Sequence, residues 1–250
     1  MSVIEPIQSS AMTSDQVVVY TAVTAGYDVV LRPAKQTIPM RFVLFTDRGE
    51  CVSGWESMPL RESFPCSVSI NRYHKFMAHQ IFPEFEYSIY VDGNIGLIGD
   101  LATLFEEFVA SGAAIGLFLH QGRRDVEEEV SACLDLGRFD ELDSQVYQAQ
   151  LQHMFDQGMP RNQVLTANGV IFRWHRHPEL AAAMEEWWHQ FQQYTKRDQL
   201  SLPYILWNTE IPAMYWDASF RRPSPFFRRY PHRGSRLKTL QTRLRHALLS

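Results

Sequence analysis

Short, continuously apolar runs alternate with longer helical patterns along this chain, and that alternation constrains its fold more than any other feature. Runs rich in branched and aromatic residues, bounded by small or turn-forming residues, are typical of strands buried on both faces. Five such runs are present, at residues 17–20, 42–45, 87–91, 114–118 and 169–172. Strands that alternate with helices predict an α/β fold with a mainly parallel central sheet flanked by helices.

The segments between these runs carry helical patterns. Residues 101–111 repeat apolar side chains at the spacing of one helix face. Asp125 with Glu128 is typical of a helix N-terminus, and Gly137 stands where that helix would end. Residues 178–194 begin with proline and predict a long helix. Ligands of such sheets bind beyond the carboxyl ends of the strands, so the loops of interest begin at Thr21, Thr46, Asp92, His120 and Trp174.

Length and charge divide the chain into three parts. A chain of 250 residues with 45% apolar residues can form one domain with a sizeable core. We expect a flexible leader over residues 1–16, one domain over 17–220 and a basic tail over 221–250. The tail holds nine Lys or Arg and no acidic residue, whereas the preceding part holds fifteen basic and 28 acidic residues. This distribution argues against nucleic-acid binding by the body and favours a separately acting tail.

The tail and the first residues of the chain bear on where in the cell the protein acts. Residues 235–249 predict a basic amphipathic helix, which can contact an anionic membrane surface or dock onto the acidic body or a partner subunit. The first sixteen residues resemble no signal peptide, and no run approaches the ~20 apolar residues of a membrane helix. Three widely spaced cysteines form no disulfide framework. We therefore expect a cytoplasmic protein, with peripheral membrane association at the inner face as an option.

A turn after the third apolar run carries the strongest chemical signal. Asp92 and Asn94 lie two residues apart, and their carboxylate and amide oxygens are ligands that Mn²⁺ and Mg²⁺ accept. Such an ion would neutralise charge on a departing diphosphate, and Lys75 could add a further positive charge. The alternative is that Asp-Gly-Asn is simply a favourable turn sequence.

The segment around this turn resembles a known family. Lys75 and residues 82–94 resemble the lysine, strand and DxD block of glycogenin-like sugar transferases. Residues 20–28 and 196–201 narrow the resemblance to the TOD/MUCI-type glycosyltransferase-like domain family, over roughly residues 17–210. Asn94 replaces the second Asp of the DxD pattern. Because an amide oxygen is neutral, the metal should bind more weakly or depend more on donor phosphate.

The resemblance implies a single GT-A-like domain that binds a donor nucleotide on its first strands. Thr21, Ala22 and Gly26 would then approach the nucleoside, with Asp28 and Asp47 nearby. Glycine permits close backbone approach to a ligand, although Gly26 is equally explained by an ordinary turn.

Basic residues follow the predicted strand 114–118, and small polar residues stand at the start of the predicted strand 169–172. His120 and Arg123 suit a diphosphate or an anionic sugar, whereas Arg123 could instead pair with the acidic run 125–129. Residues 166–169 could form the floor of an acceptor pocket. His175 and His177 could supply a third metal ligand.

Asp198 and Gln199 are the expected catalytic pair, because they resemble a block that such transferases place opposite the reacting carbon of the sugar. If the reaction inverts configuration, Asp198 would act as a general base. If it retains configuration, the two side chains would orient the sugar. The alternative for Asp198 is a helix cap ahead of residues 200–207.

The resemblance, together with the Asp92–Asn94 turn, implies a metal-assisted hexosyltransferase that uses a nucleotide-diphosphate sugar, with UDP-sugar favoured, and a glycan or lipid-linked acceptor, as in polysaccharide biosynthesis. Two alternatives remain open at the level of sequence. One plant branch of the resembling family has been assigned ceramidase activity, which suggests lipid amide hydrolysis, although the chain has no evident zinc motif or G-x-S-x-G turn. Asn94 in place of Asp suggests a nucleotide-sugar-binding protein without catalysis.

Overall fold

The computed structural model describes residues 16–135, 141–218 and 224–233, together with residues 240, 241, 243, 244, 246 and 248. All but the last residue of the predicted leader lies outside the described residues, as does Gly137 with its predicted helix stop. The predicted helix over 235–249 lies largely outside them as well.

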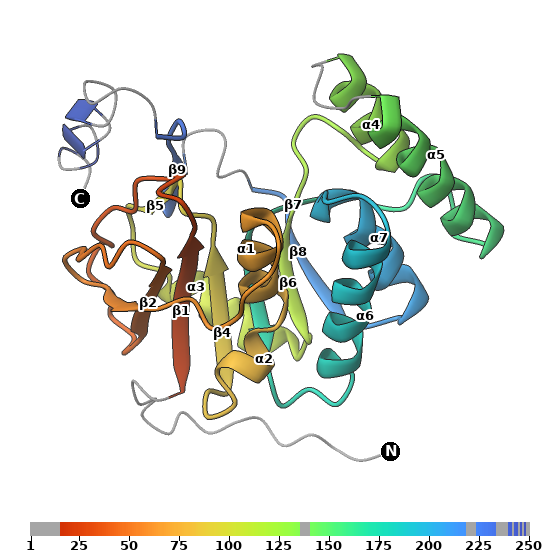
Figure 1. Cartoon of the computed structure of the whole chain (residues 1–250). Helices are drawn as coiled ribbons and strands as arrows, with labels where there is room; N and C mark the ends of the chain where they lie inside the picture. The colour runs from red at the N-terminus through yellow and green to blue at the C-terminus, as the bar shows by residue number, and fades with distance from the viewer. Residues whose placement is uncertain are drawn as a thin grey trace.

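One seven-stranded sheet forms the centre of the molecule (Figure 1), in the order β3-β2-β1-β4-β7-β6-β8. Its strands are β1 (Val17–Val23), β2 (Arg41–Thr46), β3 (Glu56–Met58), β4 (Tyr87–Val91), β6 (Ile115–Leu119), β7 (Thr166–Trp174) and β8 (Ala213–Trp216). β7 runs antiparallel to both of its neighbours, and the other pairs are parallel. The predicted α/β class with a mainly parallel sheet is therefore confirmed.

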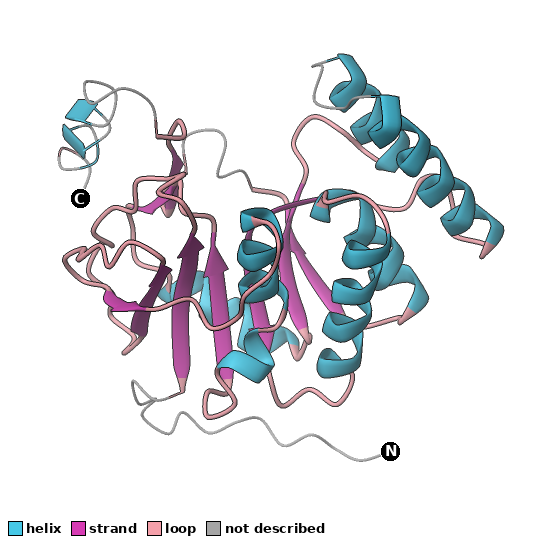
Figure 2. Cartoon of the chain, viewed as in Figure 1, coloured by secondary structure: helices cyan, strands magenta, loops and turns pink. Residues whose placement is uncertain are grey.

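Helices cover both faces of this sheet (Figure 2). The helices are α1 (Ser67–Phe76), α2 (Ala78–Ile81), α3 (Ala102–Ser111), α4 (Val126–Asp135), α5 (Glu141–Asp156), α6 (Leu180–Gln193) and α7 (Asp198–Asn208). Tyr20 of β1 belongs to a core shared with α1, α6 and α7, whereas the adjacent Val19 packs in a core with α3. Successive residues of a strand point to opposite faces, so both faces of β1 are buried.

The five predicted apolar runs all form strands, and the predicted helices 101–111 and 178–194 are observed as α3 and α6. The short strands β3 and β8 were not predicted. β3 is three residues long and has no apolar run, whereas Ala213–Trp216 is apolar but only four residues long, too short to be told from a loop or helix segment by pattern. α4 begins as predicted, since the Asp125 carboxylate accepts a hydrogen bond from the Glu128 N–H at 2.9 Å.

The direction of β7 corrects one expectation about the ligand edge. Trp174 lies beside Tyr87 at the start of β4, so the loop that follows Trp174 is at the edge opposite Asp92. His175 is enclosed there, and burial, with a contribution from the charge of Arg173, lowers its pKa to about 3. His175 and His177 therefore cannot complete a metal site at the Asp92 turn.

A second, two-stranded sheet joins segments far apart in the sequence. β5 (Ile95–Leu97) pairs with β9 (Phe227–Arg229), beside the end of β1 in Figure 1. We call residues 224–233 the C-terminal strap. Because the strap packs on the domain, the boundary predicted at residue 221 is not a structural boundary over this segment.

Beyond the strap, His246 is buried, and its Nε2 donates to the carbonyl of Arg32 at 2.6 Å. Leu240, Leu244 and Leu248 are exposed. No helix within the described part of the chain combines the length and apolar character needed to cross a bilayer.

Candidate active site

A cavity of about 680 Å³ opens where β1 and β4 end and β7 begins. Parallel strands bring loops together at their carboxyl ends, and the antiparallel β7 contributes its amino end to the same edge. Seven predicted site residues line this cavity: Ala22, Asp28, Lys75, Asp92, Asn94, Asp198 and Gln199. The structure therefore assembles most of the predicted site from four separate segments of the chain.

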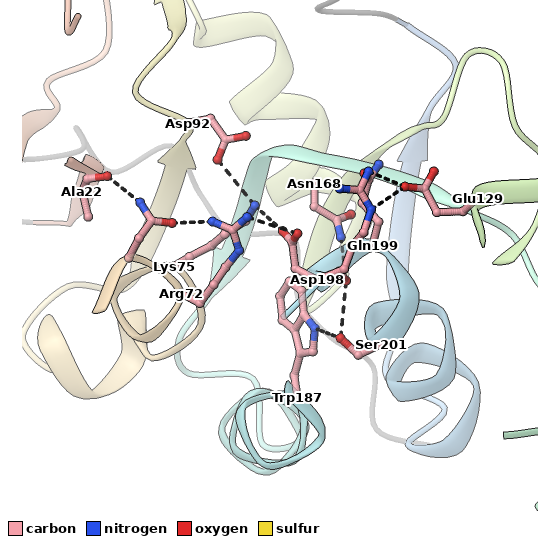
Figure 3. Close-up of polar contacts among 12 residues, drawn as sticks. Ala22, Arg72, Lys75, Asp92, Glu129, Asn168, Trp187, Asp198, Gln199 and Ser201 are labelled. Atoms are coloured by element: carbon pink, nitrogen blue, oxygen red, sulfur yellow. Dashed lines mark hydrogen bonds and ion pairs between the residues drawn. The ribbon is translucent and has the colours of Figure 1, made fainter. Parts of the chain in front are cut away.

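Lys75 lines the cavity and lies between Asp92 and Asp198 (Figure 3). It belongs to the last turn of α1 and is almost completely buried. Its Nζ donates to Asp198 Oδ2 at 2.5 Å and lies 3.5 Å from Asp92 Oδ1. One ammonium group thus connects the predicted metal turn to the predicted catalytic carboxylate, which are more than one hundred residues apart in the sequence.

Asp198 is the first residue of α7 and is buried. Burial by itself would raise the pKa of its carboxyl group, but the positive charges of Arg72 and Lys75 outweigh burial and hold the pKa far below its usual range. Arg72 Nη2 lies 3.4 Å from Asp198 Oδ1. The carboxylate is therefore ionised and firmly paired. The alternative of a helix cap is not observed, because the N-cap of α7 is Arg197 and no side chain caps the helix.

Gln199 is held by a chain of contacts from α4 and β7. Arg197 donates through Nη2 to Gln199 Oε1 at 3.1 Å and through Nε to Glu129 Oε1 at 2.7 Å. Glu129 is fully buried and also pairs with Arg123. The amide of Gln199 donates to the carbonyl of Thr166 at 3.5 Å. This network fixes the orientation of Gln199 at the cavity wall (Figure 3).

The amino end of β7 contributes to the wall of the cavity. Asn168 and Gly169 line it. The Asn168 amide donates to the backbone carbonyl of Asp198 at 3.1 Å, and its oxygen accepts from Thr166 Oγ1 at 2.7 Å. Asn168 therefore locks the start of α7 against the sheet.

The Asp92–Asn94 turn has the donor atoms that a hard cation requires, but it holds them unequally. The Asp92 side chain is 35% exposed and lines the cavity. Asn94 is buried, and its Nδ2 donates to the carbonyl of Tyr230 at 3.0 Å, which leaves Oδ1 as its atom for coordination. Gly93 is required here, because a Cβ would lie 2.6 Å from Val23 Cγ2. The residues fit a weakly held Mn²⁺ or Mg²⁺ that relies on further oxygen ligands.

Two residues that the sequence reasoning missed also line the cavity. His232, on the strap, donates through Nδ1 to Asp28 Oδ1 at 2.7 Å, which leaves Nε2 for a ligand. Burial raises the pKa of Asp28, and the hydrogen bond from His232 opposes that rise. Treating residues 221–250 as a separate tail concealed His232. Arg72 could have been found, because it lies one helical turn before Lys75.

Five predicted donor-binding residues do not line the cavity: Thr21, Gly26, Asp47, His120 and Arg123. Thr21 is buried within β1, and His120 is buried directly after β6. Arg123 pairs with Glu129, as its alternative interpretation predicted. Asp47 accepts a hydrogen bond from the Ala25 N–H at 2.8 Å and so holds a turn. Gly26 has a φ of 62° in this turn, which agrees with its alternative role as a turn residue.

Comparison with known proteins agrees with this geometry. The sequence model of the TOD1/MUCI70 glycosyltransferase-like domain matches residues 62–221. The chain belongs to this family. The matched range contains Lys75, Asp92, Asn94 and Asp198, whereas β1 and the strap lie outside it. Family membership makes glycosyl transfer the general class of activity for this domain.

A solved structure, apo mouse xyloside xylosyltransferase 1, is similar with a TM-score of 0.46 and 11% sequence identity, over 82% of this chain and 85% of that chain. At this level of similarity the likeness does not bear on activity. Comparison with curated proteins gave no match.

Proposed function

We propose that this family member transfers a hexose-type sugar from a nucleotide-diphosphate sugar, with UDP-sugar favoured, to a glycan or lipid-linked acceptor, with help from Mn²⁺ or Mg²⁺. The observation that supports this most is the convergence of Asp92, Lys75 and Asp198 on one cavity. A cavity of about 680 Å³ is large enough for a ligand of nucleotide-sugar size. We also propose a cytoplasmic site of action, with peripheral contact of the tail with a membrane surface as an option.

On the donor side, Asp92, the Asn94 amide oxygen and Nε2 of His232 would hold the metal ion. When bound, such an ion would neutralise charge on the diphosphate leaving group. Lys75 and Arg72 line the same cavity and would provide additional positive charge for the diphosphate. Asp28 would orient the His232 ring through the hydrogen bond to Nδ1.

On the acceptor side, we assign Asp198 and Gln199 to orientation of the sugar. A general base works best when its pKa lies near the working pH, and the pKa of Asp198 is held far below it. The carboxylate is also already paired with Lys75 and Arg72. Orientation by these two side chains is the role expected for a retaining transferase.

The test is titration with UDP- and GDP-sugars, with and without Mn²⁺, followed by a transfer assay. Asp92→Ala should weaken Mn²⁺-dependent donor binding and lower transfer by more than about 100-fold. Asp156→Ala, an exposed acidic residue on α5, is the matched control and should leave both unchanged. Unchanged transfer by the Asp92 variant contradicts the metal role.

The same assays separate the alternatives. Release of fatty acid from a lipid amide without a nucleotide sugar would indicate a hydrolase. Donor binding without turnover would indicate a catalytically inactive binding protein.

A further inference from the structure

Asn94 makes two hydrogen bonds to the same residue of the C-terminal strap, 136 positions away. Its side-chain Nδ2 donates to the backbone carbonyl of Tyr230 at 3.0 Å, and its own carbonyl accepts from the Tyr230 N–H at 2.8 Å. The pairing of β5 with β9 continues directly from this contact. Both residues are buried, so water does not compete for these bonds.

Only a donor can occupy the position that faces the Tyr230 carbonyl. A backbone carbonyl is an acceptor, and an ionised carboxylate has no hydrogen to give. An Asp at position 94 would place two acceptors against each other in a buried setting and leave both without a partner. The contact with the strap therefore requires an amide at position 94, independently of any role of the amide oxygen in cation binding.

The strap brings two cavity-lining residues, Arg229 and His232, to the Asp92–Asn94 turn. Beyond Tyr230, the His232 ring pairs with Asp28, and the Arg233 N–H donates to the carbonyl of Tyr27 at 3.0 Å. The cavity is consequently incomplete without the strap, because one part of its wall comes from the C-terminal segment.

We propose that Asn94 is a positioning residue: its amide fastens the strap to the Asp92–Asn94 turn and thereby places Arg229 and His232 at the donor side of the cavity. Asn in place of the second Asp of a DxD pattern is then the feature that couples the turn to the strap. The role of the strap in donor binding rests on the proposed function, whereas the attachment of the strap through the hydrogen bonds between Asn94 and Tyr230 does not.

A pure ligand role for Asn94 predicts the opposite behaviour on substitution. If the amide oxygen acted only on a metal ion, Asn94→Asp would supply a second carboxylate, tighten Mn²⁺ binding and leave the strap in place. If the amide fastens the strap, the same change releases it. The isosteric substitution therefore separates the two roles.

The experiment measures backbone hydrogen exchange of residues 224–233 in the full-length chain, with the strand β1 as internal reference. We expect exchange at Tyr230 and Arg233 to accelerate about tenfold or more in Asn94→Asp, and less in Asn94→Ala, which removes the donor without adding charge. Asn208→Asp, the same change at an exposed position, is the control and should leave the strap unchanged. If Asn94→Asp fails to fold, strap exchange in Asn94→Ala remains the test, because a pure ligand role leaves that exchange unchanged.

Binding and kinetics provide a second measurement. Asn94→Asp should weaken Mn²⁺ binding, and in a transfer assay the KM for the donor should rise about tenfold while kcat changes less. Unchanged strap exchange in Asn94→Asp, or tighter Mn²⁺ binding, overturns the inference. Exchange and metal titration require no turnover, so their failure is distinct from a failure of the wild-type protein to transfer any sugar, which would overturn the proposed function.

Discussion

The two sides of the cavity are built in different ways. The strap side depends on hydrogen bonds from a distant segment and consists of Asp28, Asp92, Asn94, Arg229 and His232. The ionic side depends on charge pairs and consists of Arg72, Lys75, Arg197 and Asp198, with Glu129 of α4 pairing with Arg197. Lys75 and Glu129 are almost completely buried, whereas Asp92 keeps 35% of its side chain exposed.

This difference indicates that the two sides of the cavity have different functions. Buried charges fully paired by other charges have little freedom to move, so the ionic side presents a fixed surface. The strap side combines an exposed carboxylate with a segment fastened by two hydrogen bonds to Asn94, and such a surface can adjust to an incoming ion and diphosphate. We therefore expect damage to the ionic side to affect folding and transfer together, and damage to the strap side to affect mainly donor binding.

The largest effect should come from Lys75→Met, which removes the cation between Asp198 and Asp92. Breaking a buried ion pair by removing one partner costs about 3–5 kcal/mol, because it leaves an uncompensated charge. Chemical denaturation should show that loss, and transfer should fall below detection. Lys35→Met, at an exposed position, should change neither quantity. If Lys75→Met folds with full stability, the ionic side is not held together by Lys75.

A smaller effect should follow Glu129→Gln, on a helix that the sequence did not connect to the site. Arg197 would lose its charged partner, and Gln199 would lose its fixed orientation. We expect a loss of stability of about 1–3 kcal/mol and transfer lowered about tenfold. Glu128→Gln is the matched control, because the Glu128 side chain pairs with the exposed Arg124. Equal effects of the two variants would show that α4 does not act on the cavity.

The smallest effect is a pH-dependent change in the free energy of unfolding, which tests the ion pairing of Asp198 on the ionic side. The folded-state pKa of Asp198 is lowered below its unfolded value, which is about 3.9. Its contribution to stability is thus fully present above pH 5 and is lost as the pH falls below about 4, where the unfolded chain binds the proton first. The free energy of unfolding of the wild type should drop by more than about 1 kcal/mol relative to Asp198→Asn over that range. Parallel curves for the two proteins would contradict the ion pairing.

Part of the candidate site followed from local pattern. Asp92 and Asn94 stand at the end of an apolar strand, and the loop after such a strand in a parallel sheet faces the ligand edge. Lys75 was proposed beside this turn for its positive charge, and Asp198 was found through the resemblance to known transferases. Arg123 shows the limit of this reasoning, because a basic residue after a strand pairs equally well with a ligand or with a neighbouring carboxylate, and here Glu129 takes it.

The sequence by itself determined the strands buried on both faces, the α/β class and the position of the Asp92 turn, because these depend on periodicity and on residues adjacent in the chain. The tertiary structure alone decided the direction of β7, the removal of His175 from the site, the contribution of Glu129 and the pairing of Asn94 with Tyr230. Each of these features is a contact between segments far apart in the sequence. Such contacts are determined by strand pairing and burial, which form only when the whole chain packs.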